Sequence, residues 1–384
     1  MRISDVYTGL FDGLHATPPV CDKGAIYLGI SNITRDGHID FSNIRYIKEE
    51  HLPKWTQRVT PHEGDIVFSY EATLNLYALI PKDFWGCLGR RLALIRTDNN
   101  KVNNKYLYYY FFSPEWRATI AQNTITGSTV DRISIANFPN LKISLPPRPI
   151  QNSIATTLSR YDNLIENYHR QIKLLEEAAQ RLYKEWFVDL HFPGHENVKV
   201  IDGVPEGWLS YNIDDVFDIK YGKNLSTKEI APTGKYPVYG ANGIIGYYDK
   251  YNCDEPVVLI TSRGNGSGDV LKTYERYTFV TNNSFIVKAK VDFPCCILPF
   301  TFGLVRSVNF RSVRTGAAQP QLTNASIHLM NITLPTSDLI KKYCDAMEPN
   351  FKLVRHLRNQ LSLLTESRDR LLPKLMSGEI ELKI

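Results

Sequence analysis

The side chains most able to recognise a partner lie in glycine-rich loops of the second half of the chain. Between Arg263 and Gly268, glycines alternate with polar residues, and glycine lets a backbone approach a ligand closely. Arginine binds guanine edges in a DNA groove, and asparagine or glutamine binds adenine edges. The candidates of this kind in the second half are Tyr239, Asn242, Ser262, Arg263, Asn265, Gln319 and Gln321.

The first half carries a comparable set of cations and hydroxyl donors, which are the groups that bind phosphates. Arg90 and Arg91 follow Gly89 in a loop, a setting that suits phosphate contact. An ordinary solvated surface would explain both sets as well, so that alternative stays open. The candidates in the first half are Lys54, Arg58, Lys82, Arg90, Arg91, Ser128, Thr129 and Arg132.

Catalytic chemistry is not indicated by the sequence. The tract Leu145 to Arg148 lacks both ends of the Asp/Asn-Pro-Pro-aromatic motif of adenine methylation, and no Walker A sequence occurs. The nine histidines do not cluster with cysteines or carboxylates at metal spacing. We therefore expect no catalytic residue and no metal. A self-contained nuclease with duplicated domains, built from scattered carboxylates, remains the alternative from another class.

Composition places the chain among globular proteins with a substantial core. Hydrophobic residues make up 43% of 384 residues, and the net charge of +5 permits a nucleic-acid partner without demanding one. None of the six cysteines forms a C-x-x-C pair, so free thiols in a reducing cytosol are expected. No charged-then-apolar leader opens the sequence, and the most apolar run, 293–305, contains two prolines. We expect a soluble, cytoplasmic protein.

A heptad seam between Ile154 and Trp186 is expected to hold in place the domains that carry the candidate binding residues. Apolar residues recur there at alternating steps of four and three, which predicts a long helix that needs a partner helix. At ~1.5 Å per residue it would be roughly 50 Å long. The seam residues are Ile154, Leu158, Tyr161, Ile165, Tyr168, Ile172, Leu175, Ala179, Leu182 and Trp186.

The partner helix is present in the same chain at an offset of 189 residues. Adding 189 to each seam position gives a second seam, in which Asn350 and Arg368 are polar and fit a register-setting role. Identities outside the seam, such as Leu164/Leu353 and Leu174/Leu363, follow the same offset, so the chain is a tandem duplication. The second seam consists of Tyr343, Met347, Asn350, Val354, Leu357, Leu361, Leu364, Arg368, Leu371 and Leu375.

Turn signals and clustered strands predict an α+β fold in each half rather than a regular βαβ sheet. We expect a globular domain at 1–145, a long helix at 146–190, a linker at 191–203, a second globular domain at 204–334, and a second long helix with the tail at 335–384. Pro349 is expected to interrupt and kink the second helix, and Gly378 to cap it. Antiparallel pairing of the helices would place two similar domains at opposite ends of a rod with pseudo-two-fold symmetry.

A rigid spacer would hold two similar domains a fixed distance apart. Such an arrangement suits DNA, because the same groove face recurs every ~34 Å along the duplex. Two non-identical domains would then read two unlike half-sites. A coiled-coil scaffold without a DNA role is a further alternative, but it leaves the polar glycine-rich loops unexplained.

Several tracts resemble type I restriction-modification specificity (S) subunits. Two, from Leu145 to Ile154 and from Arg181 to Phe187, resemble their first conserved helical region, and Leu371 to Ile380 resembles the end of the second. The tracts 204–209 and 236–243 resemble the opening of a target recognition domain, and 315–322 resembles its close. The ordered combination covers essentially the whole chain.

The chain departs from this pattern at its N-terminus. The Pro205 to Trp208 preamble has no counterpart there, and Ile3 to Val6 matches Ile213 to Val216 instead. The opening segment of the first domain is either missing or supplied by C-terminal residues.

The resemblance implies a non-catalytic DNA-recognition subunit. It would read a bipartite asymmetric DNA site through its two domains, join two methyltransferase (M) subunits, and work with restriction (R) subunits. No cofactor is expected on this chain, while S-adenosylmethionine, ATP and Mg would belong to the partners. The bases read, the length of the gap and the helix faces that dock the M subunits are not given by the sequence.

Overall fold

The structure is a computed structural model that describes residues 1–127, 130–290, 298–316 and 319–382. The chain forms two compact units, 1–166 with 362–384 and 167–361. Each unit therefore holds one globular domain together with a segment of both long helices. The finer boundaries expected for the recognition domains and the linker stay predictions.

The first domain contains short strands and helices followed by the first long helix. Its elements are β1 (Tyr7–Asp12), β2 (Ala25–Leu28), β3 (Arg45–Ile47), α1 (Leu52–Trp55), β4 (Ile66–Ser69), β5 (Tyr77–Leu79), β6 (Gly86–Leu88), β7 (Leu92–Thr97), α2 (Asn104–Tyr110), α3 (Pro114–Gln122), β8 (Thr124–Ile125), β9 (Arg132–Ile133) and α4 (Arg148–Tyr183).

The second domain lies between the two long helices in the sequence. Its elements are β10 (Val200–Ile201), β11 (Val204–Pro205), β12 (Leu209–Asn212), α5 (Ile213–Val216), β13 (Phe217–Tyr221), β14 (Tyr236–Gly240), β15 (Gly243–Tyr248), β16 (Val258–Thr261), β17 (Val270–Lys272), β18 (Phe279–Val280), β19 (Ser284–Ala289), α6 (Leu298–Ser307), α7 (Asn324–Ile327), β20 (Asn331–Leu334) and α8 (Ser337–Ser377).

Sheet topology is the same in both domains, which confirms the duplication and the α+β class. The main sheet has the order β1-β7-β4-β5 in the first domain and β13-β19-β16-β17 in the second, with all pairs antiparallel. A smaller sheet has the order β3-β2-β6 or β15-β14-β18, and each combines one antiparallel and one parallel pair. Equivalent loops therefore follow equivalent strands in the two domains.

The two long helices form as the heptads predicted. Pro149 occupies the first turn of α4, where its missing N–H is tolerated, and a π-helical stretch continues α4 from Lys184 to Val188. The interruption expected at Pro349 is wrong, because α8 continues through it. Seam residues on both sides of this proline are buried, so tertiary packing holds the helix together. Gly378 has φ of 76° and ends α8 as expected.

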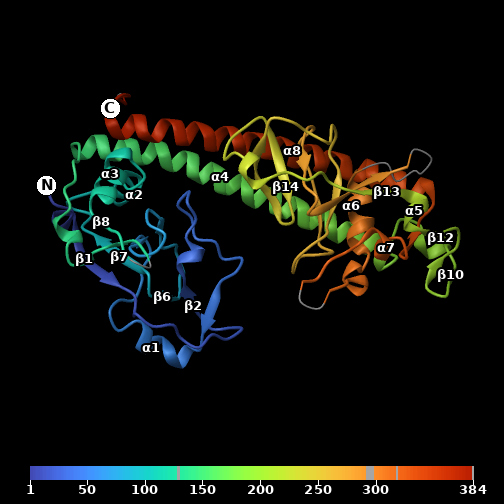
Figure 1. The fold of residues 1–384 in the computed structure, drawn as a ribbon, viewed down its shortest axis with the longest axis horizontal. Coiled ribbons are helices and arrows are strands. Elements are labelled where there is room, and N and C mark those ends of the chain that lie inside the picture. The colour runs from blue at the N-terminus through green and yellow to red at the C-terminus, as the bar shows by residue number, and fades with distance from the viewer. Residues whose placement is uncertain (128–129, 291–297, 317–318, 383–384) are drawn as a thin grey trace. The chain divides into compact units, whose positions relative to one another are not determined.

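In each unit, a segment of α4 lies antiparallel beside a segment of α8 (Figure 1). All twenty seam residues are buried or half-buried. Leu158 is completely buried, and each fully buried aliphatic side chain of this kind contributes ~1.5–3 kcal/mol to folding. The polar members have partners, since the Asn350 side chain donates to the Leu175 carbonyl at 3.2 Å and Arg368 pairs with Asp162. The predicted antiparallel helix pair is confirmed.

Aromatic residues fill the core of the first domain beside the helices. Pro114 begins α3 rather than only ending α2, because Ser113 caps the helix and the proline stands in its first turn. This places Trp116 in the core, where its indole N–H donates to the Tyr77 hydroxyl at 2.9 Å.

The opening segments of the two domains differ as the sequence predicts. In the second domain β12 pairs with β20 over four residues. In the first domain the equivalent pairing is reduced to a bridge between Arg2 and Lys142. Leu382, which follows α8, packs against the core of the first unit.

Candidate nucleic-acid interface

A loop after strand β4 of the first domain is held against the hairpin that contains β9. The Ile133 amide donates to the Tyr70 carbonyl at 2.8 Å, and the Ala72 amide donates to the Asp131 carbonyl at 2.9 Å. Ala72 has φ of 69°, so the loop turns sharply at this residue. A bridge between Glu71 and Arg132 brings Arg132 beside this loop.

The second domain repeats this geometry after the equivalent strand β16. The Leu322 amide donates to the Ser262 carbonyl at 2.8 Å, and the Gly264 amide donates to the Pro320 carbonyl at 3.0 Å. Gly264 has φ of 82° where the first domain has Ala72, and Arg263 bridges Gln321 where Glu71 bridges Arg132. We call these two loop assemblies, 70–76 with 130–133 and 262–269 with 314–316 and 319–322, the reading loops of each domain.

Cations gather around Tyr70 at the first reading loop. The Tyr70 hydroxyl donates to the Arg90 carbonyl at 2.7 Å, and Arg91 lies 3.5 Å from the carboxylate of Glu71. Burial, followed by the charges of Asp12 and Glu71, raises the pKa of Tyr70 to about 12, so the phenol is a neutral donor.

A second ion pair lies beside this cluster. Arg58 pairs with Asp12 at 2.6 Å, and the same carboxylate accepts a hydrogen bond from His15 at 2.7 Å. The structure therefore brings four of the sequence-predicted residues together, namely Arg58, Arg90, Arg91 and Arg132. Lys54 on α1 and Lys82 after β5 are exposed, and no hydrogen bond or ion pair among the described residues joins them to the cluster. Ser128 and Thr129 lie outside the described residues.

Polar and cationic side chains are exposed at the second reading loop. A Cβ on Gly266 would approach the Asn242 amide oxygen to 3.3 Å, which places the β14–β15 turn beside the loop. Arg314 donates to the carbonyls of Ser267 and Asn265, and Arg311 pairs with Asp269 at 2.6 Å. These contacts of Arg311 and Arg314 stabilise the conformation of the loop. The predicted residues with exposed side chains here are Asn242, Arg263, Asn265, Gln319 and Gln321.

Two residues predicted from the sequence do not fit direct DNA contact. Tyr239 is 5% exposed in β14, and its hydroxyl donates to Glu275 at 2.7 Å. Ser262 is fully buried, and its hydroxyl donates to the Asn282 carbonyl at 3.2 Å. Both side chains are taken up by the fold, and we leave them out of the proposed interface.

Three polar residues at the second reading loop, Lys223, Asn282 and Asn283, were not predicted from the sequence. The Asn282 amide donates to the Lys223 carbonyl at 3.0 Å, and the Ser262 amide donates to the Asn283 carbonyl at 2.8 Å. Asn282 and Asn283 precede β19 as Arg90 and Arg91 precede β7. This matching position in the repeat would have identified the two asparagines.

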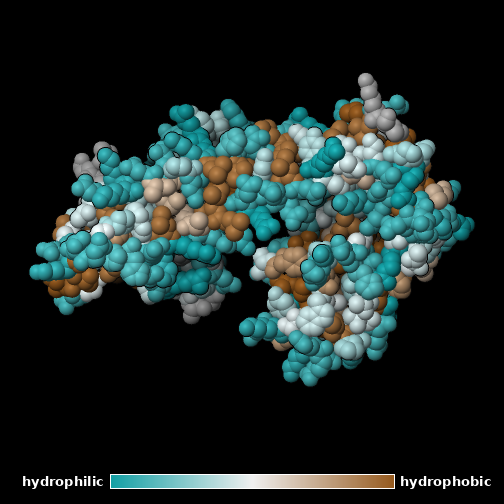
Figure 2. Space-filling model, turned by 180° about the vertical axis from the view of Figure 1, so that it is seen from behind, coloured by the Kyte–Doolittle hydropathy of each residue, from teal (hydrophilic) through white to brown (hydrophobic). Residues whose placement is uncertain are grey.

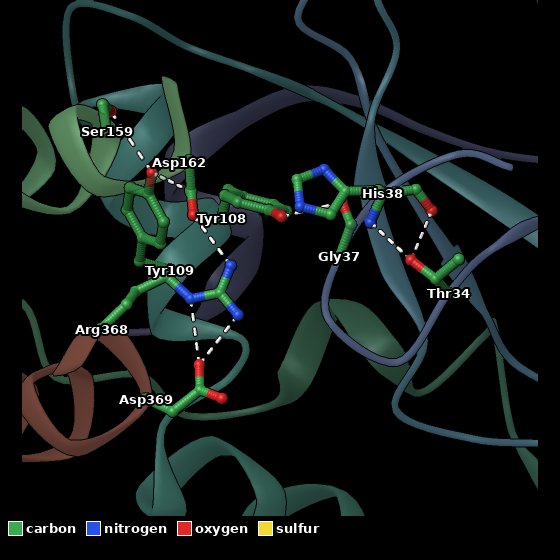
Figure 3. Close-up of polar contacts among 9 residues, drawn as sticks. All are labelled: Thr34, Gly37, His38, Tyr108, Tyr109, Ser159, Asp162, Arg368 and Asp369. Atoms are coloured by element: carbon green, nitrogen blue, oxygen red, sulfur yellow. Dashed lines mark hydrogen bonds and ion pairs between the residues drawn. The ribbon is translucent and has the colours of Figure 1, made fainter. Parts of the chain in front are cut away.

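Each globular domain is tied to both long helices by a tyrosine, a carboxylate and an arginine. In the first unit, the Tyr109 hydroxyl from α2 donates to Asp162 of α4 at 2.5 Å, and Arg368 of α8 pairs with the same carboxylate at 2.9 Å (Figure 3). Hydrogen bonds to Asp162 and Asp369 raise the pKa of Arg368 against the opposing effect of burial.

The second unit has a similar arrangement at different positions. The Tyr274 hydroxyl donates to Glu176 of α4, and Arg358 of α8 pairs with that carboxylate at 3.3 Å. Neither set is related to the other by the 189-residue offset, so the two domains reached the same kind of attachment separately. We call these two sets the domain anchors.

The repeat in this chain is also found by comparison with known proteins. The model of the type I restriction modification DNA specificity domain matches this chain twice, at residues 21–177 and 205–362. The chain belongs to this family. Members of the specificity family are the non-catalytic DNA-recognition subunits of type I restriction-modification systems, so this family member recognises DNA and is not an enzyme.

Individual relatives of this family member agree with the match. The type I restriction enzyme MjaIX specificity subunit of Methanocaldococcus jannaschii is 25% identical over 366 residues, which cover 88% of this chain and 82% of that protein. The MjaVIII specificity subunit of the same organism is 21% identical over 386 residues, covering 91% and 87%. A crystal structure of a type I S subunit from M. genitalium superposes with a TM-score of 0.56 at 19% identity, covering 100% of this chain and 96% of that one, and shows the same fold.

The structure offers no support for the nuclease alternative. Within the described ranges, no three His, Cys, Asp or Glu side chains are grouped as a metal site would require. Of the cysteines that the structure describes, Cys87, Cys253 and Cys344 are buried and Cys21 is half-buried.

None of the helices among the described residues combines the length and the apolar character that a bilayer span requires.

Proposed function

We propose that the two reading loops bind the two parts of one split, asymmetric DNA sequence, with the helix pair setting the gap between them. The observation that carries this proposal is the repetition of one backbone frame with different side chains on it. The predicted and exposed side chains at the first loop are arginines, while those at the second are Arg263 and several amides. Arginine and amide side chains are those that discriminate bases, so unlike sets would read unlike half-sites.

The direct test is a binding assay of the full chain with its methyltransferase partners on DNA. Affinity for one split sequence is expected to fall steeply as salt concentration rises, because phosphate contacts release counterions. Binding that is insensitive to both salt and sequence would contradict the proposal.

Substitutions in one reading loop are expected to affect one half-site. Arg263→Ala should cost ~1–3 kcal/mol of binding when the half-site of the second domain is present, and should relax specificity there only. Arg90→Ala should do the same for the other half-site. Both side chains are exposed, and Arg90 contacts Tyr70 only through its backbone. Selection of bound sequences from a random library measures the effect.

Lys220→Ala is the matched control, because the Lys220 side chain is exposed on β13 and pairs with Asp218 rather than with a residue of the reading loop. It should leave both half-sites unchanged. A change in both half-sites on replacing Arg263 alone would argue against separate readers.

We further propose that two methyltransferase subunits dock on exposed leucines of the long helices. Leu164 and Leu174 of α4 are 39% and 54% exposed, and their repeats in α8, Leu353 and Leu363, are 44% and 57% exposed. Apolar patches are visible among hydrophilic surface in Figure 2. Exposed apolar residues that recur at the repeat offset provide two equivalent sites, which suits two copies of one partner. Restriction subunits would join this complex, and S-adenosylmethionine, ATP and Mg would bind the partners.

A charged residue in place of one of these leucines is expected to prevent one methyltransferase subunit from binding. Leu174→Glu alone and Leu363→Glu alone should each leave complexes with a single methyltransferase, because they occupy equivalent positions in the two repeats. The double variant should bind none, as native mass spectrometry of the mixture would show. Leu329→Glu, at a leucine that is 77% exposed before β20, is the control. Unchanged stoichiometry in the double variant would show that the partners dock elsewhere.

A further inference from the structure

Two adjoining cavities of about 280 and about 660 Å³ lie in the second unit. Residues of α4, α6 and α8 line the smaller one, and many of them are apolar, such as Met347 and Phe351. The larger extends from the same wall toward β17. Lys272, Phe302 and Arg306 line both cavities, so a ligand can reach these side chains from either side.

Positive charge exceeds negative charge around the larger cavity, with four cations against two carboxylates. Arg311 is neutralised by Asp269 at 2.6 Å, and Arg358 pairs with Glu176 at 3.3 Å. In the part of the chain that the structure describes, Lys272 and Arg306 have no carboxylate partner within ion-pair distance.

Aromatic rings lie beside Lys272 and beside Arg358, the cation that is paired with Glu176. The Lys272 ammonium lies 4.4 Å from the ring centre of Phe302 and 5.1 Å from that of Tyr274. The Arg358 guanidinium lies 4.0 Å from the ring centre of Tyr274, and its buried Nε has no hydrogen-bond partner among the residues that the structure describes. Buried donors without acceptors are costly, and an anion in the cavity would supply the missing acceptors.

We propose that these cavities bind a small phosphate ester with an aromatic ring, of the nucleoside monophosphate class. The phosphate would lie in the larger cavity beside Lys272 and Arg306, and the ring would enter the smaller cavity past Phe302. A backbone phosphate of duplex DNA shares the same charge. However, its bases are stacked within the helix, so it would leave the apolar cavity empty. A free nucleotide fits both cavities.

Calorimetric titration of the full chain with AMP, adenosine and inorganic phosphate tests this site. AMP is expected to bind at least tenfold more tightly than either fragment, because only AMP occupies both cavities. Lys272→Met and Arg306→Met should each weaken AMP binding by about tenfold or more, the effect of losing ~1.4 kcal/mol. The variant Lys220→Met, at an exposed position of β13, should bind AMP as the unaltered chain does. Thermal melting checks that each variant is folded, and either variant alone is sufficient if the other does not fold.

The absence of AMP binding at millimolar concentration would overturn the proposal. Affinity for AMP no better than for inorganic phosphate would also overturn it, as would unchanged AMP affinity in a folded Lys272 or Arg306 variant. A competition arm separates the two sources of phosphate. Saturating AMP should leave the affinity for a DNA duplex unchanged, and displacement of the duplex by AMP would assign the cavity to the DNA backbone instead.

The pH dependence supplies a readout that a merely structural role would not give. Burial, opposed by the charge of Glu176 and assisted by the charges of Arg358 and Arg306, lowers the pKa of Lys272 to about 8. AMP affinity is therefore expected to fall between pH 7 and 9 as the ammonium loses its proton. The groups that face Lys272 are Glu176 of α4, Arg306 of α6, Arg358 of α8 and Tyr274. Lys272→Met should remove most of this fall, and an equally steep fall in that variant would contradict the assignment.

Discussion

Replacing Arg368 with methionine is expected to lower the free energy of unfolding by ~3–5 kcal/mol, the cost of breaking a buried ion pair from one side. Arg368 is 7% and Asp162 17% exposed, so the carboxylate would stay mostly buried after the guanidinium is lost. The Tyr109 hydroxyl would remain on Asp162 as its donor, but the carboxylate would have no cation. Denaturant unfolding of the full chain measures the loss.

Lys173→Met is the matched control on the same helix pair. Lys173 is 78% exposed and lies 4.0 Å from Glu177, so its removal should cost ~0–1 kcal/mol. Combining Arg368→Met with Asp162→Leu should recover most of the stability, because no uncompensated charge is then buried. A loss for Arg368→Met no larger than for Lys173→Met would show that this domain anchor does not stabilise the fold.

Lengthening the helix pair is expected to change the DNA sequence that is bound. Four residues inserted between residues 166 and 167 of α4, with four more between 361 and 362 of α8, add one turn at facing levels. One turn of four residues adds ~6 Å and ~40° of rotation. A base-pair step adds ~3.4 Å and roughly 35°. The gap between the half-sites should widen by one to two base pairs, and affinity for the original site should fall at least tenfold.

The matched control inserts the same four residues after Glu196, in the segment between α4 and β10 and outside the helix pair. That variant should bind the original site unchanged. Selection from libraries with gaps of different length measures both variants. An unchanged gap in the helix-insertion variant would contradict the spacer role, while the half-site readers would be unaffected.

Prediction from sequence succeeded where a period or a repeat determines the structure. The heptad positions from Ile154 to Trp186 needed a partner with the same period, and only the segment 189 residues later supplies one. Prediction failed where packing overrides a local signal. Pro349 removes one backbone donor, but the buried residues on either side, Met347 and Val354, keep α8 continuous.

The site residues show a similar division. Glycine and arginine in one tract indicated a loop with polar side chains, and Arg263 is exposed as expected. Residue type does not reveal which way a side chain points, so Tyr239 and Ser262 were included although both are buried. Lys223 and the Asn282–Asn283 pair were missed because their proximity to Ser262 comes from backbone hydrogen bonds between distant strands.

The sequence by itself determined the duplication, the two long helices and the family, because each is encoded in spacing along the chain. Only the tertiary structure decided which polar residues share a reading loop, how the domain anchors join each domain to both helices, and which side chains lie beside Lys272 and Arg306. Those features depend on contacts between residues that are distant in the chain. Such contacts form only when the strands pair and the helices pack.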